Sequence, residues 1–135
     1  MIHLDANVAI ALLNDRPRIV RERFDAARGA DSIAMSMIVY HELMFGAAAS
    51  ARRRDNEEKI ALFIAGGAIA LLPFEEPDAR AGADIRAVLR KLGAPIGPYD
   101  VLIAAQARRA GATLVTANGR EFERVPELIV ADWAA

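Results

Sequence analysis

The sequence contains no cysteine, only two lysines and few aromatic residues. Without cysteine the chain has no disulfide bond, no thiolate metal site and no cysteine nucleophile. No apolar run approaches the roughly 18–20 residues that a membrane-spanning helix needs. The stretch from Met1 to Asp5 does not resemble a secretory signal, because an acid appears at once and no basic stretch comes first. We therefore expect a soluble, cytoplasmic protein with no membrane partner.

The residues that are present suit one folded domain. The chain has 135 residues, of which 54% are hydrophobic, and this is enough to bury a substantial core. The formal net charge is −1, but the basic residues are almost all arginines and they cluster around positions 16–23, 52–54 and 80–90. Because arginine can bind phosphate through two parallel hydrogen bonds, such clusters are compatible with nucleic acid. A solvated helix surface remains the simpler explanation of the clusters taken alone.

Short apolar strands alternate with helices along the chain. The pattern predicts strands at 2–4, 32–35, 68–72, 113–116 and 128–130. It predicts helices at 6–14, 18–28, 37–50, 55–64, 77–92 and 98–110, and a turn at Asn118-Gly119. This alternation is typical of a three-layer α/β/α sandwich around a mainly parallel sheet of about five short strands. No repeat or linker interrupts it, so we expect residues 1–135 to form a single domain.

Several polar side chains fall where these strands end. Asp5 ends the first strand, Thr116 and Asn118 end the fourth, and Glu121 follows shortly after. Ligands of parallel sheets bind outside the carboxyl ends of the strands. Asp100 lies in the first turn of the helix at 98–110, and it joins the same edge only if the preceding loop crosses that edge.

Glu42 stands within a strongly apolar helix, in the stretch MSMIVYHELMFGAAAS. A helix that is apolar nearly all round is predicted to be buried. An ionised carboxylate on a buried helix needs a cation, a metal or hydrogen-bond donors, because its burial alone costs several kcal/mol. The alternative is that Glu42 lies at the edge of the buried face or pairs with an arginine.

Each of these acids also has a structural explanation when taken singly. Asp5 suits the N-cap of the following helix, and Asp100 benefits from the helix dipole by about 0.3–1 kcal/mol. Taken together, however, Asp5, Glu42, Asp100 and Glu121 would repel one another unless a hard cation neutralises them. Oxygen-rich sites of this kind suit Mg²⁺ or Mn²⁺. Such ions activate a water molecule and stabilise the charge of a phosphoryl group in transfer.

No competing site is visible in the sequence. It contains no GxxxxGK, GxGxxG or HExxH motif. His3 and His41 lie in a predicted strand and a predicted apolar helix, so we interpret them as core or supporting residues rather than metal ligands. A receiver domain also carries strand-end acids but needs a lysine near the end of a late strand, whereas Lys59 and Lys91 both fall in helices.

Four stretches of the chain resemble a known family. In chain order they are HLDANVAI, MIVYHELMFGA, IGPYDVLIAAQARRAG and LVTANGREFERVPELIVADW. Their order and spacing resemble those of the PIN-domain ribonuclease toxins of bacterial VapBC toxin–antitoxin modules, over essentially the whole chain. The resemblance implies an α/β/α fold, Mg²⁺- or Mn²⁺-dependent endoribonuclease activity, often on tRNA, and assembly as a homodimer. It also implies a small antitoxin whose C-terminal segment enters the active-site groove.

The resemblance assigns roles by position. Asp5, Glu42 and Asp100 match the three core metal-binding acids, and Glu121 matches a fourth, more variable one. Asn118 matches an asparagine of the family's Thr-Asn-Asn run, in which Thr116 is expected to support the ligands. Two positions depart from the pattern, since Ala6 replaces a hydroxyl residue and Ala117 replaces the first asparagine. Neither departure removes a metal ligand.

Two other functions remain open from sequence. The first is a PIN domain that has lost catalysis and acts by binding RNA, or by binding an antitoxin at a DNA operator; the intact acids argue against this reading. The second is a metal-dependent nuclease of DNA or of structured RNA in processing. For assembly, the helices at 6–14 and 37–50 carry more apolar surface than a two-layer packing needs, and such surface indicates an interface. We therefore expect a homodimer, with the antitoxin covering a further apolar groove.

Overall fold

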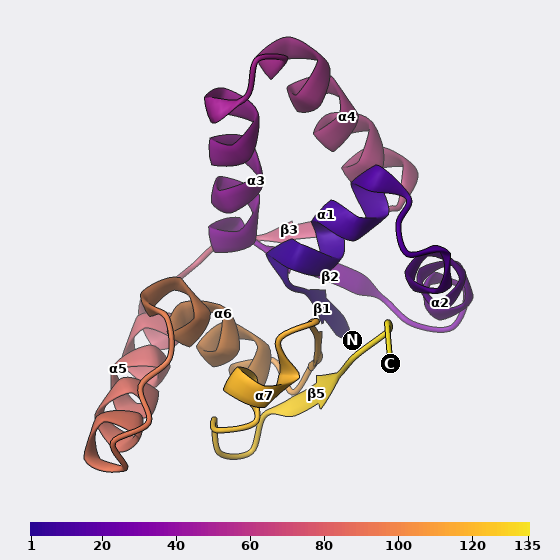
Figure 1. Ribbon diagram of the computed structural model, residues 1–135. Coiled ribbons are helices and arrows are strands. Elements are labelled where there is room, and N and C mark those ends of the chain that lie inside the picture. Colours follow the sequence, from indigo (N-terminus) through magenta and orange to yellow (C-terminus); the bar gives the residue numbers. More distant parts are fainter.

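The computed structural model describes residues 1–135 (Figure 1). The strands are β1 (Ile2–Leu4), β2 (Ile33–Ser36), β3 (Ala70–Leu72), β4 (Thr113–Val115) and β5 (Ile129–Ala131). The helices are α1 (Ala6–Asn14), α2 (Arg18–Arg28), α3 (Met37–Ala49), α4 (Arg53–Gly66), α5 (Glu76–Lys91), α6 (Pro98–Arg109) and α7 (Gly119–Phe122).

The strands form one parallel sheet in the order β3-β2-β1-β4-β5. β1 is central, and Leu4 pairs in register with Val115 of β4. The strand order reverses next to β1, because the chain adds strands on one side and then returns to the other. Ligands bind at such a reversal, outside the carboxyl ends of the strands. The predicted α/β fold with a five-stranded parallel sheet is confirmed.

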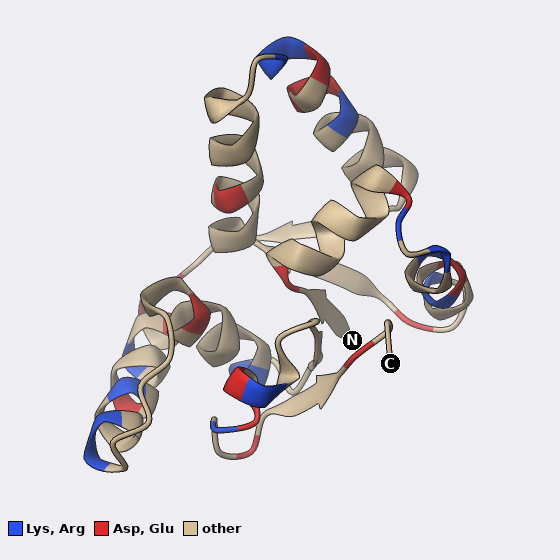
Figure 2. Cartoon of the chain, in the orientation of Figure 1, with Lys and Arg blue, Asp and Glu red and all other residues tan.

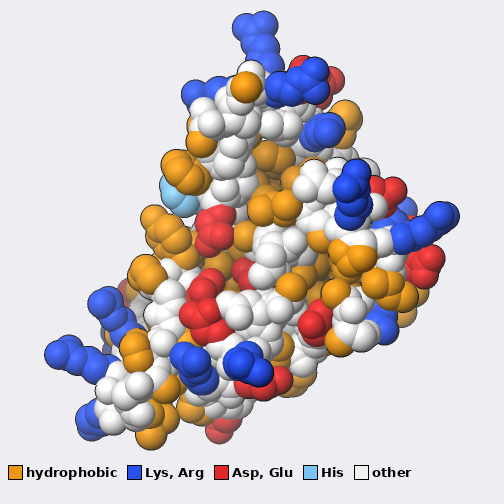
Figure 3. All heavy atoms as spheres, in the orientation of Figure 1, with side chains coloured by type: hydrophobic (Ala, Val, Ile, Leu, Met, Phe, Trp, Pro, Cys, Tyr) orange, Lys and Arg blue, Asp and Glu red, His pale blue; other side chains and the backbone are white.

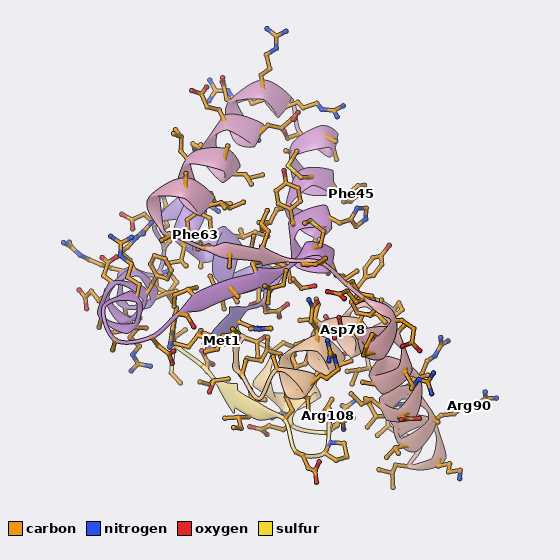
Figure 4. The ribbon with its side chains drawn as sticks, turned by 180° about the vertical axis from the view of Figure 1, so that it is seen from behind. Met1, Phe45, Phe63, Asp78, Arg90 and Arg108 are labelled. Atoms are coloured by element: carbon orange, nitrogen blue, oxygen red, sulfur yellow. The ribbon has the colours of Figure 1, made fainter.

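Helices cover both faces of the sheet, as right-handed crossover connections require. In Figure 1, α1 passes in front of β1 and β2, and Figure 4 shows the molecule from behind, with α5 and α6 on that side. α5 and α6 pack along each other, and α3 contacts both β2 and α6. α3 and α6 therefore meet at the edge where β1 and β4 end.

One apolar core fills the space between these layers. Its largest fully buried side chains include Phe24, Phe122, Leu4 and Ile103. Gly111 follows α6 with a positive φ of 65°, a conformation that a glycine adopts without strain, and this lets the chain turn directly into β4. No helix is long and apolar enough to cross a membrane.

Three local predictions from sequence are wrong. The turn expected at Asn118-Gly119 is instead the entrance to the short helix α7. The helix predicted at 55–64 begins two residues earlier and runs to Gly66, since Asp55 lies in its first turn rather than at its start. α3 is not buried all round: Val39 and Leu43 are buried, while Phe45 is 67% exposed. An apolar pattern on every side of a helix therefore does not by itself mean that the whole helix is buried, because part of its apolar surface can face solvent.

Candidate active site

Asp5 is held at the end of β1 by one donor from the start of α1 and one from the residue after β4. It is 4% exposed and caps α1, where one carboxylate oxygen accepts the Ala6 N–H at 2.8 Å. Its other oxygen accepts the Thr116 hydroxyl, also at 2.8 Å. Thr116 is fully buried just after β4, and its oxygen accepts the Asn118 N–H at 3.0 Å. The neighbouring strands β1 and β4 thus fix both the position and the direction of this carboxylate.

Glu121 links α7 to the loop that precedes α6. One of its oxygens accepts the Gly97 N–H at 2.8 Å, and the other accepts the side-chain amide of Asn118. The resemblance placed Asn118 at the site without giving its side chain a specific contact. In the structure its amide holds Glu121, and only its backbone reaches toward Asp5, through Thr116.

Asp100 lies in the first turn of α6, close to the backbone of Gly97. A Cβ atom added at Gly97 would come within 2.9 Å of an Asp100 carboxylate oxygen. A glycine at this position leaves room for the carboxylate, while its N–H holds Glu121. Asp100 and Glu121, which are distant in sequence, are therefore brought to the same side of one loop.

Glu42 reaches the same place from α3. A groove of about 440 Å³ lies between α1, α3 and the start of α6, and its lining includes Glu42, Asp100, Ile10, Phe45 and Tyr99. Figure 2 shows the acidic positions at the end of β1, within α3, at the start of α6 and in α7. In the space-filling view, acidic side chains gather in the middle of this face among hydrophobic ones (Figure 3).

The carboxylates perturb one another in this setting. Burial raises the pKa of Asp100 to about 6, with the negative charges of Asp5, Glu121 and Glu42 adding to the effect. Burial also raises the pKa of Glu42, to which the charge of Asp5 contributes. For Asp5, burial raises the pKa although two hydrogen bonds favour its charged form. Strongly perturbed acids in a groove are typical of functional sites.

No ion pair compensates these acids, and the charge of His41 only partly offsets the rise in the pKa of Glu42. The ion pairs of the structure involve none of Asp5, Glu42, Asp100 and Glu121. Hard oxygen donors without a cationic partner fit Mg²⁺ or Mn²⁺ in their chemistry. No three of the His, Asp and Glu side chains converge tightly enough to form a ready metal cage. The donor set therefore fits a hard divalent ion in its chemistry, although three of its side chains do not yet converge on one point.

Two contributors to this site were not recognised from sequence. Gly97 has no side chain that could signal a role, yet its N–H and its missing side chain both serve the acids. Asn7 accepts the Ala117 N–H at 3.2 Å and so ties α1 to the loop after β4. The only sign of this role in the sequence is the position of Asn7, two residues after the acid that ends the first strand. Of the two histidines, His3 is buried as expected, while His41 is exposed and lies edge-on to Tyr99.

The fold and the acidic edge agree with a known family. The family model described as "PIN domain" matches residues 2–128. The chain belongs to the PIN-domain family. Among curated relatives, this PIN domain is 37% identical over 131 residues to the tRNA(fMet)-specific endonuclease VapC of Shigella flexneri, covering 97% of this chain and 96% of the relative. It is 32% identical to ribonuclease VapC2 of Rickettsia felis, with 96% of each chain covered.

Solved structures place this PIN domain among VapC proteins. The structure of VapBC2 from Rickettsia felis, bound to a DNA fragment from its promoter, matches with a TM-score of 0.91 and 31% identity, covering 98% of this chain and 99% of the other. VapBC-1 from nontypeable Haemophilus influenzae matches with a TM-score of 0.89 and 34% identity over the full length of both chains. The predicted membership in the VapC-like PIN domains is confirmed.

Proposed function

We propose that this PIN domain is the toxin of a VapBC-type toxin–antitoxin module and acts as a divalent-metal-dependent endoribonuclease, with tRNA as its substrate class. The main observation is the set of uncompensated carboxylates at the end of β1 and β4, in a chain whose full-length relatives are named ribonucleases. PIN-domain ribonucleases are generally dependent on a divalent metal. The cytoplasm, where tRNA is found, is the proposed compartment.

Asp5, Glu42, Asp100 and Glu121 are the proposed holders of Mg²⁺ or Mn²⁺. When bound, such an ion activates a water molecule and stabilises negative charge on the phosphoryl group. The protein's own part is to keep these oxygens in place. Thr116 fixes Asp5, and Gly97 together with Asn118 fixes Glu121, so that rotation of the side chains is restricted before the substrate arrives.

The two departures from the family pattern leave this arrangement intact. At position 6 the backbone N–H still bonds to Asp5, and the Thr116 hydroxyl supplies the second donor. At position 117 the backbone N–H bonds to Asn7. The contacts therefore favour an active nuclease over a domain that only binds.

The proposed assembly is a homodimer with a small antitoxin. Ile10, Phe45 and Tyr99 line the acidic groove and are 47%, 67% and 50% exposed. Exposed apolar side chains gathered in this way indicate a surface for a partner. For the antitoxin we propose the hollow of about 250 Å³ between α1, α2 and α4, where Phe63 and Leu62 lie beside Arg21 and Lys59. Light scattering of the toxin, alone and with its antitoxin, tests this assembly; a stable monomer at micromolar concentration in both samples contradicts it.

The decisive experiment for activity uses purified toxin and a labelled tRNA transcript. Cleavage is expected with Mn²⁺ or Mg²⁺, and none is expected with a chelator. A single-stranded DNA of the same sequence and the purified antitoxin serve as controls. Preferential cleavage of DNA, or RNA cleavage that persists in chelator, contradicts the proposal.

A further inference from the structure

A third cavity, referred to below as the hollow, lies beside the acidic groove. It measures about 360 Å³ and lies between α5 and the start of α6. Its walls combine Arg86 and Arg90 of α5 with the apolar side chains of Pro95, Ile96 and Pro98. Pro98 also lines the acidic groove, so the two cavities share a wall at the start of α6.

The two arginines of this hollow have no partner within the protein. Arg86 and Arg90 are spaced four residues apart on α5, are exposed, and take part in none of the ion pairs or side-chain hydrogen bonds. Other arginines near α5 are paired: Arg80 with Glu76, and Arg109 with Asp78. Figure 4 shows Arg90 at the end of α5 far from Asp78. Both arginines that border the hollow are thus free to bind an external anion.

Further positive charge surrounds the same loop. Arg124 donates to the carbonyl oxygen of Pro95 at 3.1 Å, and the exposed Arg120 neighbours Glu121 on α7. In Figure 3, Lys and Arg side chains border the acidic patch along the lower edge of this face. A negative centre bordered by positive side chains is the charge pattern expected for a phosphate chain that crosses a metal-dependent site.

We propose that the hollow bordered by Arg86 and Arg90 binds the RNA backbone next to the scissile phosphate. This inference rests on the proposed ribonuclease function and names a substrate-binding subsite within it. Each guanidinium matches the geometry of a phosphate group. The apolar side of Pro95 and Ile96 provides a surface for a ribose or a base. Arg86 and Arg90 are substrate-binding residues that contact a part of the RNA away from the reacting atoms.

The test compares the Arg86→Gln/Arg90→Gln double variant with the wild type and with Arg80→Gln, a control on the same helix outside the hollow. Binding of a fluorescein-labelled tRNA transcript is measured by anisotropy in chelator, across salt concentrations. The double variant is expected to bind at least about tenfold more weakly. Its slope of log affinity against log salt is expected to fall by about 1.4 to 1.8, because each phosphate contact contributes about 0.7 to 0.9.

A kinetic measurement separates substrate binding from a structural role. With Mn²⁺, the double variant is expected to raise KM with little change in kcat, since the lost contacts bind substrate and transition state alike. Arg86→Lys/Arg90→Lys is expected to recover part of the affinity, because lysine retains the charge without the forked geometry. The Mn²⁺-induced rise in melting temperature should stay at the wild-type value in both variants.

The possible failures are distinct. If the wild type binds and cleaves tRNA while the double variant matches Arg80→Gln in affinity and salt slope, the subsite is wrong and the ribonuclease proposal stands. If the double variant keeps its RNA affinity but loses binding to the purified antitoxin, the hollow is a protein interface and the inference is overturned. If the wild type neither binds nor cleaves tRNA, the ribonuclease proposal fails and this inference fails with it.

Discussion

Asp78 and Asp5 are both almost fully buried, at 2% and 4% exposure, but their surroundings are opposite. Asp78, near the start of α5, accepts the guanidinium N–H of Arg109 at 2.7 Å and the N–H of Glu75 at 2.9 Å. Asp5 receives only neutral donors, and its charged neighbours are other acids. The first acid has its counter-charge within the fold, while for the second we propose a counter-charge from a bound metal ion. Burial alone therefore does not mark a functional acid; the missing counter-charge does.

The largest expected effect is a loss of catalytic activity, and it is expected in the region of Asp5. Asp5→Asn and Asp100→Asn should each lower the rate of tRNA cleavage by more than about 100-fold, because losing a metal ligand exceeds the 10–100-fold typical of losing its supporting hydrogen bond. Initial rates with Mg²⁺ measure this, and circular dichroism checks the fold. Asp84→Asn, an exposed acid on α5, is the matched control. Wild-type turnover in either site variant would show that the assigned site is wrong.

The second effect is on stability. Asp78→Asn should lower the free energy of unfolding by about 1–3 kcal/mol, because a buried charge-assisted contact is lost; the half-exposed Arg109 limits the cost. Urea denaturation measures the change, with Arg80→Gln as an exposed control expected within about 1 kcal/mol of wild type. Cleavage per folded molecule should persist. A stable but inactive Asp78→Asn protein contradicts the distinction between the two regions.

A smaller loss is expected at the fourth acid. Glu121→Gln should reduce cleavage about tenfold, within the range for supporting groups, because a glutamine retains one oxygen for the Gly97 N–H. Asn118→Ala should cost a comparable amount, since it frees one Glu121 oxygen. Both are compared with Asp100→Asn under the same Mg²⁺ concentration. Equal loss in all three variants refutes the ranking.

The smallest effect is a shift in melting temperature without metal. The pKa of Asp100 is about 6 in the folded protein against 3.8 for an ordinary aspartate, so the folded state binds more protons between these values. Stability in chelator should therefore fall as pH rises from about 4 to about 6, and stay lower above it. At pH 7.5 Asp100→Asn should melt a few degrees above wild type, less a helix-dipole loss of about 0.3–1 kcal/mol, and this gap should narrow toward pH 4.

Metal addition completes that measurement. Mn²⁺ should raise the wild-type melting temperature by binding the folded site, and should raise that of Asp100→Asn far less. Thermal-shift series across pH and Mn²⁺ concentration provide both readings. Equal Mn²⁺ responses, together with a lower melting temperature of the variant in chelator, would show that Asp100 only stabilises the start of its helix and does not bind the metal.

Most of the fold could be predicted because the signals are local. The strands and most helices follow from apolar periodicity, and Gly111 ends α6 where a positive φ is needed. The errors came where local signals mislead. Asn118-Gly119 is a common turn pair, yet the backbone enters α7. In α3 the uniform apolar pattern did not indicate which side packs on the sheet. The side that carries Phe45 stays exposed.

By itself, the sequence determined which residue types end the strands and begin the helices, because burial and capping act over one or two turns of chain. Only the tertiary structure decided which acids meet. Asp100 comes to Asp5 and Glu121 because the loop before α6 crosses the end of the sheet and its Gly97 N–H binds Glu121. The pairing of Asp78 with Arg109, and the unpaired state of Arg86 and Arg90, follow from how α5 packs along α6. Such contacts depend on helix crossings between distant segments, which a local periodicity does not encode.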